Sequence, residues 1–280
     1  MKLLTLNTHS LVGEDFDRRA AVFAAALARE APDVIALQEV NQTADAPVLT
    51  EPLSRFVPCG GSRPFREDLY VWRLVRALES AGLFYFWTWL PVKRGYGRYD
   101  EGLAFLCRSP IAEARSAVIS RTDDYENWRR RMALMIRLEG ERAWFCNLHT
   151  SWWGDSDEPF AEQWGRLLPH VRRDEPVLLL GDLNNPAELR GEGYDLVASC
   201  GFFDTYALAD VRSGCATAQG GIDGWHGRLT PDEGVRIDQI WCNRPCSVTE
   251  YRTVFDGEIY ERVSDHFGVM VQVKEGAWKQ

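Results

Sequence analysis

Short runs of apolar residues recur along the whole chain, and most are bounded by Gly, Pro, Asp or Asn. Runs of this length that are rich in Leu, Val, Ile and aromatic residues are typical of buried β-strands, although a buried helix fits such short runs as well. The strands predicted in this way cover residues 2–6, 34–38, 103–107, 132–138, 144–148, 177–180, 236–241 and 269–273.

Between some of these runs, apolar residues recur at helical spacing. Residues 16–30 are rich in Ala and end before Pro32, and residues 66–81 end before Gly82. Weaker patterns of the same kind predict helices over residues 158–173 and 193–199. The longest stretches without a regular pattern are residues 43–65, 85–101 and 213–234, and loops of that length are usually functional.

Strand and helix patterns are mixed over the whole length, with no linker and no internal repeat in the sequence. A hydrophobic content of 45% in 280 residues is that of a globular protein. We therefore expect a mixed α/β (α+β) chain that forms one domain over residues 1–280.

The formal net charge of −9 changes the range of expected partners. Proteins that grip a nucleic-acid backbone usually carry a basic stripe, whereas the densest basic run here is Arg129-Arg130-Arg131. The charge therefore disfavours a nucleic-acid substrate. An acidic protein can still cut DNA at a local site, so a nuclease remains the second interpretation.

The seven cysteines include no C-x-x-C pair, so we interpret them as small buried thiols. The N-terminal apolar run is too short for a signal peptide, and no stretch has the length of a membrane span. We expect a cytoplasmic protein without a membrane partner, and its oligomeric state stays open.

Several predicted strands run into a polar residue that is able to bind a metal or move a proton. Strand ends deliver such groups to one rim of a sheet, where distant parts of a chain can form one site. Taken singly, each has an ordinary explanation: a solvated carboxylate, a satisfied histidine, or a turn. The residues are Asn7, Glu39, His149, Asp182, Asn184, Asp238, Asp265 and His266.

Their order along the chain resembles the endonuclease/exonuclease/phosphatase superfamily, which includes DNase I-like nucleases, inositol phosphatases and neutral sphingomyelinases. The matching motifs span residues 6 to 266: Leu6-Asn7, Leu37-Gln38-Glu39-Val40, Asn147-Leu148-His149-Thr150, Gly181-Asp182-Leu183-Asn184, Arg236-Ile237-Asp238 and Ser264-Asp265-His266. Further stretches are similar to a bacterial branch that includes the maltose 6'-phosphate phosphatases. They are Tyr96-Gly97-Arg98-Tyr99-Asp100-Glu101-Gly102, Ser151-Trp152-Trp153, Asn184-Asn185-Pro186 and Gly221-Ile222-Asp223-Gly224-Trp225.

The resemblance implies a four-layer α/β sandwich, in which two packed, mostly antiparallel sheets are flanked by helices. It also implies a divalent cation, because a hard cation neutralises phosphate oxygens and prefers oxygen ligands. Glu39 would be its principal ligand, with Asn7 and Asp265 in the same shell or just outside it. Mg²⁺ is the expected ion and Mn²⁺ the alternative, in a site of one or two ions.

The same resemblance implies catalytic roles. Asp182 would orient or deprotonate the attacking water, and Asn184 would hold the phosphate or the water. His266, oriented by Asp238, would stabilise the charge on the scissile phosphate. His149, with Glu101 as its partner, would donate to the phosphate or protonate the leaving oxygen.

Two positions stay open at this stage. Arg131 or its neighbour Arg130 precedes a predicted strand where family members often place a phosphate-binding arginine, and a surface arginine cluster fits equally well. His9 departs from the residue that many members carry two positions after the Asn. It could complete a metal shell, contact phosphate, or be a bystander.

Aromatic residues near the proposed rim bear on the substrate, since the chain has eleven tryptophans. Aromatic faces stack on sugar rings and on bases. We expect Trp152, Trp153 and Trp225 to line a substrate pocket, with Tyr99 in the neighbouring motif. For the aromatic residues of 84–87, burial in the core is the better interpretation.

These features together predict a divalent-metal-dependent phosphoesterase that hydrolyses a small phosphate monoester, such as maltose 6'-phosphate, with an activated water. The alternative is a metal-dependent endonuclease or exonuclease acting on DNA or RNA. A sphingomyelinase-like phosphodiesterase and a non-catalytic binding module rank below both, because the membrane features are missing and every main motif is intact.

Overall fold

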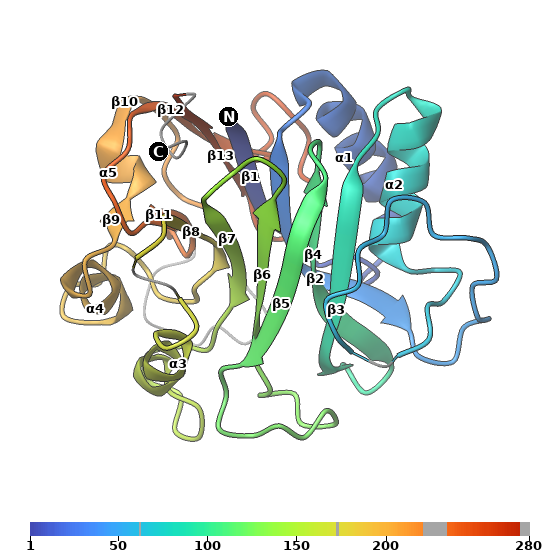
Figure 1. Cartoon of the computed structure of the whole chain (residues 1–280), viewed down its shortest axis with the longest axis horizontal. Coiled ribbons are helices and arrows are strands. Elements are labelled where there is room, and N and C mark those ends of the chain that lie inside the picture. Colours follow the sequence, from blue (N-terminus) through green and yellow to red (C-terminus); the bar gives the residue numbers. More distant parts are fainter. Residues whose placement is uncertain (62, 172–173, 221–233, 275–280) are drawn as a thin grey trace.

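The computed structural model describes residues 1–61, 63–171, 174–220 and 234–274, and two β-sheets form its centre (Figure 1). The first sheet contains β1 (Lys2–Asn7), β2 (Val34–Thr43), β3 (Phe86–Gly95), β4 (Tyr99–Cys107), β10 (Ala209–Ser213), β12 (Val248–Val254) and β13 (Gly268–Val273). Its seven strands lie in the order β10-β12-β13-β1-β2-β4-β3.

The second sheet has six strands and packs face to face on the first. It contains β5 (Ile111–Val118), β6 (Met132–Leu138), β7 (Trp144–His149), β8 (Val177–Asp182), β9 (Phe203–Asp204) and β11 (Asp238–Cys242). The strand order is β5-β6-β7-β8-β11-β9.

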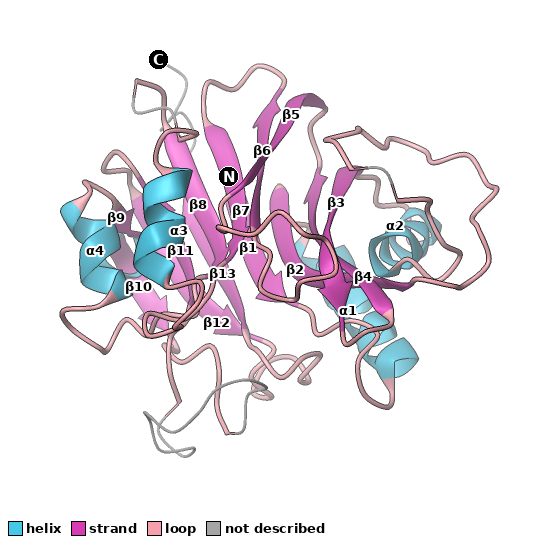
Figure 2. Ribbon diagram, turned by 90° about the horizontal axis from the view of Figure 1, so that it is seen from below, coloured by secondary structure: helices cyan, strands magenta, loops and turns pink. Residues whose placement is uncertain are grey.

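Helices cover the outer faces of both sheets, as the view in Figure 2 shows. On the first sheet lie α1 (Phe16–Glu30) and α2 (Tyr70–Ser80), and on the second lie α3 (Phe160–Leu167) and α4 (Gly193–Ser199). A short helix, α5 (Thr205–Leu208), follows β9. The molecule is therefore the four-layer sandwich that the family resemblance implies.

Alternation along the strands explains the layers. In β1, Leu3 packs between the sheets, whereas Leu4 packs under the helices of the first sheet. In β8, Leu178 and Leu180 face the first sheet, and Leu179 faces the helices of the second. Because successive side chains point to opposite faces of a strand, an uninterrupted apolar run marks a strand that is covered on both sides.

Strand direction brings the polar strand ends together. β1 pairs in parallel with β2, and β7 pairs in parallel with β8, so these strands end at the same rim. β11 is antiparallel to β8 and begins there, with Asp238 opposite Asp182. On the other side of Asp182 in the same row lies His149.

A buried cluster of amide groups joins the two sheets below that rim. The Nε2 of Gln38 donates to the Oδ1 of Asn147 at 2.7 Å, from β2 to β7. The Nδ2 of Asn147 donates in turn to the carbonyls of Leu37 and Ala104, each at 2.9 Å. A buried polar network that satisfies its members fixes one arrangement of the layers, since any sliding would leave unpaired polar groups.

Each of the strands and helices predicted from apolar patterns is present, although α2 and α3 are shorter than predicted. The prediction of an irregular stretch over residues 85–101 is wrong, because β3 and the start of β4 occupy it. Pro91 lies inside β3, which a central strand does not tolerate, but β3 is at the edge of its sheet. Edge strands β5 and β10 were missed because their exposed residues interrupt the apolar pattern.

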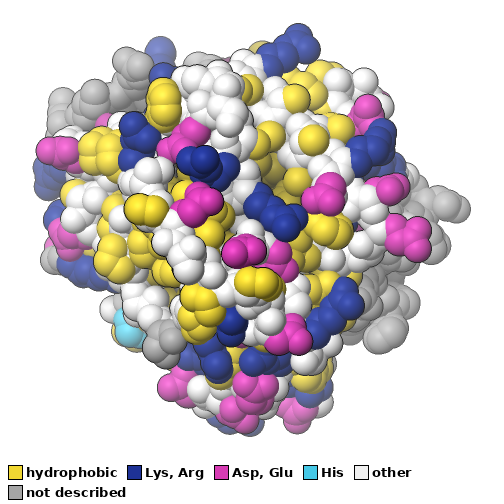
Figure 3. Space-filling view, turned by 90° about the vertical axis from the view of Figure 1, so that its right-hand side faces the viewer, with side chains coloured by type: hydrophobic (Ala, Val, Ile, Leu, Met, Phe, Trp, Pro, Cys, Tyr) yellow, Lys and Arg dark blue, Asp and Glu magenta, His cyan; other side chains and the backbone are white. Residues whose placement is uncertain are grey.

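Surface charge on one face of the molecule is mixed. Figure 3 shows basic and acidic side chains interspersed there, without a basic band. Among the described residues, no helix is both long enough and apolar enough to cross a bilayer.

The close approach of β7 and β8 gives a test of the fold. Gly181 has φ +144°, and a Cβ there would lie 2.0 Å from the backbone oxygen of Leu148. We expect Gly181→Ala to lower the free energy of unfolding by about 2 kcal/mol or more. Urea unfolding followed by circular dichroism would measure the change.

Gly165, inside α3, is the matched control because a Cβ there meets nothing within 4 Å. Gly165→Ala should raise the free energy of unfolding by about 0.5–1 kcal/mol, as Ala is the better helix former. Equal effects of the two substitutions would contradict the close approach of the strands.

Candidate active site

A cavity of about 450 Å³ opens at the rim where the strand ends meet. Both sheets supply its walls, so residues far apart in the sequence face one space. The predicted site residues that line it are Glu39, Glu101, Arg131, His149, Trp152, Asp182, Asn184, Asp265 and His266.

Asn7, at the end of β1, links the two halves of this site. Its Nδ2 donates to the Oε1 of Glu39 at 3.0 Å and to the Oδ2 of Asp182 at 3.1 Å. Glu39 belongs to the first sheet and Asp182 to the second, so one amide group spans the gap between the sheets. Its donors fix the separation of the two carboxylates.

Glu39 points into the cavity because β2 is irregular at this residue. The register of β2 against β4 shifts between Leu37 and Val40, and Glu39 has φ +50°. A bulge adds one residue to a strand and reorients the side chain that carries it. A positive φ is strained for a residue other than Gly or Asn, and such strain occurs at functional sites.

One oxygen of the Glu39 carboxylate is available for a ligand. Its Oε2 is buried without a hydrogen-bond partner among the described residues, and it lies 3.4 Å from the Nδ1 of His9. That nitrogen is also 3.6 Å from the Oδ2 of Asp265. Burial raises the pKa of Glu39, but the nearby imidazole of His9 and the hydrogen bond from Asn7 act against it, and the pKa lies well below its usual range.

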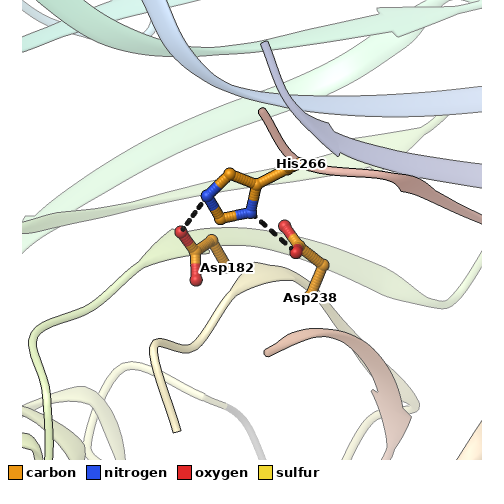
Figure 4. A group of neighbouring side chains, drawn as sticks. All are labelled: Asp182, Asp238 and His266. Carbon is orange, nitrogen blue, oxygen red and sulfur yellow. Dashed lines mark hydrogen bonds and ion pairs between the residues drawn. The ribbon is translucent and has the colours of Figure 1, made fainter. Parts of the chain in front are cut away.

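His266, just before β13, lies between two carboxylates (Figure 4). Its Nδ1 is 2.9 Å from the Oδ2 of Asp238, and its Nε2 is 3.9 Å from the Oδ2 of Asp182. Burial lowers the pKa of His266, but the charge and hydrogen bond of Asp238 raise it more, and the pKa lies well above 6.5. The neighbouring carboxylates therefore favour the protonated form of the ring.

Asp182, at the end of β8, accepts a hydrogen bond from the backbone N–H of Asn184 at 2.9 Å as well as the one from Asn7. Burial and the nearby charge of Asp238 raise the pKa of Asp182 to about 7. The Nε2 of His149 is 3.6 Å from its Oδ2. Burial, together with the charge of Arg131, holds the pKa of His149 well below 6.5.

Asn184 closes the turn after β8. It has φ +49°, a conformation that Asn tolerates better than most residues, and its Nδ2 donates to the carbonyl of Thr150 at 2.9 Å. The turn that the Asp-Leu-Asn-Asn-Pro sequence predicts is thus formed, and it carries Asp182 and Asn184 to the cavity wall.

Of the two candidate arginines, Arg131 lies in the cavity wall and Arg130 does not. The Nη2 of Arg130 is 2.7 Å from the Oδ1 of Asp123, and its Nη1 contacts the carbonyl of Val92. Arg131 is 3% exposed, and within the described chain no carboxylate lies within 4.0 Å of its guanidinium. Its Nη1 donates to the carbonyls of Trp128 and Arg130, while its Nε has no described partner.

Glu101 does not make the expected pair with His149. Its Oε1 lies 3.1 Å from the Nζ of Lys93, directly across from it on β3. Lys93 also lines the cavity, and the sequence analysis did not select it. The apolar residues before Lys93 could have indicated a strand there. Pro91 argued against a strand, so Lys93 was left in a predicted loop.

The aromatic predictions are partly wrong. Trp152 lines the cavity together with Trp128 and Tyr96, whereas Trp153 packs against the apolar cluster under α3. The Tyr99 side chain lies in the core beneath α1 and α2, where its hydroxyl donates to the carbonyl of Leu11 at 3.0 Å. Trp225 lies outside the described residues.

The donor set at one end of the cavity fits a hard divalent cation. Glu39 and Asp265 offer carboxylate oxygens, one of them buried without a hydrogen bond, and the amide oxygen of Asn7 accepts the backbone N–H of His9 at 3.3 Å. Asp182, Asp238 and His266 also place ligand atoms within 4.8 Å of one another. In that second group, however, the hydrogen bond between His266 and Asp238 already uses one ring nitrogen and one carboxylate oxygen.

Comparison with known proteins identifies relatives of this arrangement. The model of the Endonuclease/Exonuclease/phosphatase family matches residues 4–266. A solved endonuclease/exonuclease/phosphatase family protein from Leptotrichia buccalis is 27% identical, with a TM-score of 0.82 over 98% of this chain and 99% of that chain. No curated protein gave a significant match.

More distant solved structures share the fold. A mannosyl-6-phosphatase from Bacteroides thetaiotaomicron is 20% identical, with a TM-score of 0.63 over 98% of this chain and 99% of its own. TDP2 of D. rerio, solved with a single-strand DNA product, is 16% identical, with a TM-score of 0.61 over 98% of each chain.

The His266–Asp238 pair gives a pH test. A pKa above 6.5 in the folded state means that the protonated ring contributes stability that is complete below pH 6.5. That contribution is lost as the pH rises through the folded pKa. Asp238→Asn removes the neighbouring charge, so the pKa of His266 should fall.

Titration of the imidazole resonances by NMR would measure this pKa in the wild-type protein and in the variant. An unchanged midpoint for His266 in the Asp238→Asn variant would show that Asp238 does not hold the charged ring.

Proposed function

Because the chain belongs to the endonuclease/exonuclease/phosphatase family, whose members hydrolyse phosphoesters, we propose that it is a divalent-metal-dependent phosphatase of a small phosphate monoester. Its first-choice substrate is a sugar phosphate, such as a phosphorylated disaccharide. The cavity of about 450 Å³ is in the size range of small-ligand sites.

The observation that carries the proposal is the buried guanidinium of Arg131 in the cavity wall, which has no carboxylate within 4.0 Å in the described chain. Burying a cation without a direct ion pair is costly, and natural proteins usually pair it. A phosphate group would supply the missing charge and accept hydrogen bonds from the planar guanidinium fork. Arg131 and the acidic residues Glu39 and Asp182 face the same space, as a phosphate-binding site requires.

The protonation states of three residues suit them to different catalytic roles. His266, held as an imidazolium by Asp238, would donate a hydrogen bond to a phosphate oxygen and stabilise the charge that develops there. Asp182, with its pKa of about 7, is suited to orient a water and accept its proton. His149 is neutral at the same pH and would contact the phosphate or the leaving oxygen.

Glu39, Asp265 and Asn7 would hold the divalent cation. When bound, the cation neutralises phosphate oxygens and activates water for attack. Asn7 keeps Glu39 beside Asp182, so the ligand and the proposed base stay within one hydrogen-bonded unit.

Aromatic residues at the cavity support a sugar substrate. The rings of Trp128 and Trp152 lie 6.4 Å apart at 56°, and Trp128 and Tyr96 are 46% and 51% exposed. Exposed aromatic faces beside a polar cavity are suited to stack on sugar rings. The Bacteroides mannosyl-6-phosphatase, which shares the fold, is named for a substrate of this class.

Phosphate release tests the proposed function. With Mg²⁺, the purified protein should release inorganic phosphate from members of a panel of sugar phosphates, and EDTA should abolish the release. Glu39→Gln keeps the side-chain shape but removes a charge from the cation site, so kcat/KM should fall by about 100-fold or more.

The control is Glu139→Gln, which changes an exposed glutamate after β6 and should leave kcat/KM unchanged. Silence across the panel together with cleavage of plasmid DNA would replace the phosphatase with a nuclease. Undiminished hydrolysis after removal of all divalent ions would contradict the cation site.

Trp152 gives a test of sugar recognition. Trp152→Ala should raise KM for sugar phosphates by about 10-fold, as expected for loss of one stacking contact, and leave KM for methyl phosphate nearly unchanged. Trp153→Phe is the control, because Trp153 packs under α3 and does not line the cavity. Equal changes for substrates with and without a ring would argue against stacking.

A further inference from the structure

The cavity wall contains an ion pair that the proposed mechanism does not use. Lys93 on β3 and Glu101 on β4 lie opposite each other, with 3.1 Å between Nζ and Oε1, and their side chains are only 8% and 7% exposed. Burying such a pair usually costs as much as the attraction returns, so stability alone does not account for it.

Lys93 and Glu101 share this wall with Arg131. All three also surround a smaller recess next to His149. Around this recess, two cationic side chains flank one carboxylate, Glu101, while the charge of Glu39 reaches both cations from another wall of the cavity. The acidic residues of the site, in contrast, come from the ends of β2 and β8 and from the segment before β13.

Hydrogen-bonding capacity is left over as well. An ammonium group has three N–H donors, and in the described part of the chain Lys93 has one side-chain partner, Glu101. The Nε of Arg131 has no described partner. Unused donors on two cations in one cavity wall match an anion with several acceptor oxygens.

Electrostatics point the same way. Burial, followed by the charge of Arg131, lowers the pKa of Lys93. Burial likewise lowers the pKa of Arg131. Both cations are therefore held at a cost that a bound anion would remove.

We propose that Lys93 and Arg131 form a subsite for the terminal oxygens of a phosphate dianion, and that Glu101 positions the Lys93 ammonium on the cavity wall. A monoester carries three terminal oxygens and up to two negative charges, whereas a diester carries two such oxygens and one charge. Two cations gain more from the dianion, so Lys93 sets the preference for monoesters. This inference rests on the proposed function and adds the basis of its selectivity.

Gly95 supports the positioning role of Glu101. A Cβ at residue 95 would come within 2.6 Å of the Oε2 of Glu101, so this carboxylate lies directly against the bare backbone of β3. The contact leaves Glu101 little freedom to move away from Lys93. A positioned ammonium loses less conformational entropy when the anion binds.

The decisive variant is the double substitution Lys93→Met/Glu101→Gln, which removes both charges and keeps the side-chain volumes. Lys93→Met alone leaves Glu101 buried without its partner and can unfold the protein for that reason, so the double variant keeps the test informative. Lys93→Arg retains a cation and should restore part of the lost function. Circular dichroism would establish that each variant is folded.

The readouts are hydrolysis of p-nitrophenyl phosphate, a monoester, and bis(p-nitrophenyl) phosphate, a diester, in the presence of Mg²⁺. The double variant should lose about 10-fold or more in monoester kcat/KM, through a higher KM, and change by less than about 3-fold toward the diester. Calorimetry should show a similar loss of affinity for inorganic phosphate. Lys2→Met, which breaks a Lys–Glu pair outside the cavity, is the matched control.

A double variant with wild-type monoester KM and phosphate affinity would overturn the inference, because Lys93 would then serve only to balance Glu101. Equal losses toward monoester and diester would also overturn it. A wild-type protein that hydrolyses no monoester would instead contradict the proposed function. Calorimetry with inorganic phosphate would still decide whether Lys93 belongs to an anion site.

Discussion

The side-chain amide of Asn7 is the contact on which the arrangement of the site depends. It is 1% exposed and donates to a carboxylate of each sheet, Glu39 on one side and Asp182 on the other. Two sheets in a sandwich are held by apolar packing, which has little directional preference. The hydrogen bonds of Asn7 and the hydrogen bond between Gln38 and Asn147 are directional, so they fix the position of one sheet relative to the other.

This relative position of the sheets places groups of opposite charge around one space. Glu39, Asp182 and Asp265 bring negative charge, and Arg131 and Lys93 bring positive charge from other strands. A phosphate ester needs both: cationic partners for its oxygens and a carboxylate to take a proton from water. Since the groups are fixed by strands and buried hydrogen bonds, little rearrangement is needed when charge develops on the substrate.

The apolar runs predicted the strands, and the family resemblance implied the layers. Buried strands give continuous apolar runs, and the polar residue after each run lies at the rim, as Asp182 and His149 show. What the sequence did not reveal depends on local geometry. The bulge that turns Glu39 inward leaves no mark in the alternation of residues around it, and Pro91 hid the edge strand that carries Lys93.

Side-chain direction was the other limit. Trp152 and Trp153 are neighbours in sequence, yet one faces the cavity and the other packs against the core, and a turn of the backbone begins at Trp153. Tyr99 lies beneath α1 and α2, whereas Glu101, two residues further along β4, lines the cavity. A motif identifies which segment reaches the site, and the backbone decides which of its residues does so.

The row formed by His149, Asp182 and Asp238 across β7, β8 and β11 has a consequence for stability. Two carboxylates directly opposite each other on adjacent strands repel each other. His266 contacts both of them, and its positive charge reduces this repulsion. The chain thus retains an unfavourable contact between two buried carboxylates. A functional site can keep such a contact at a cost in stability.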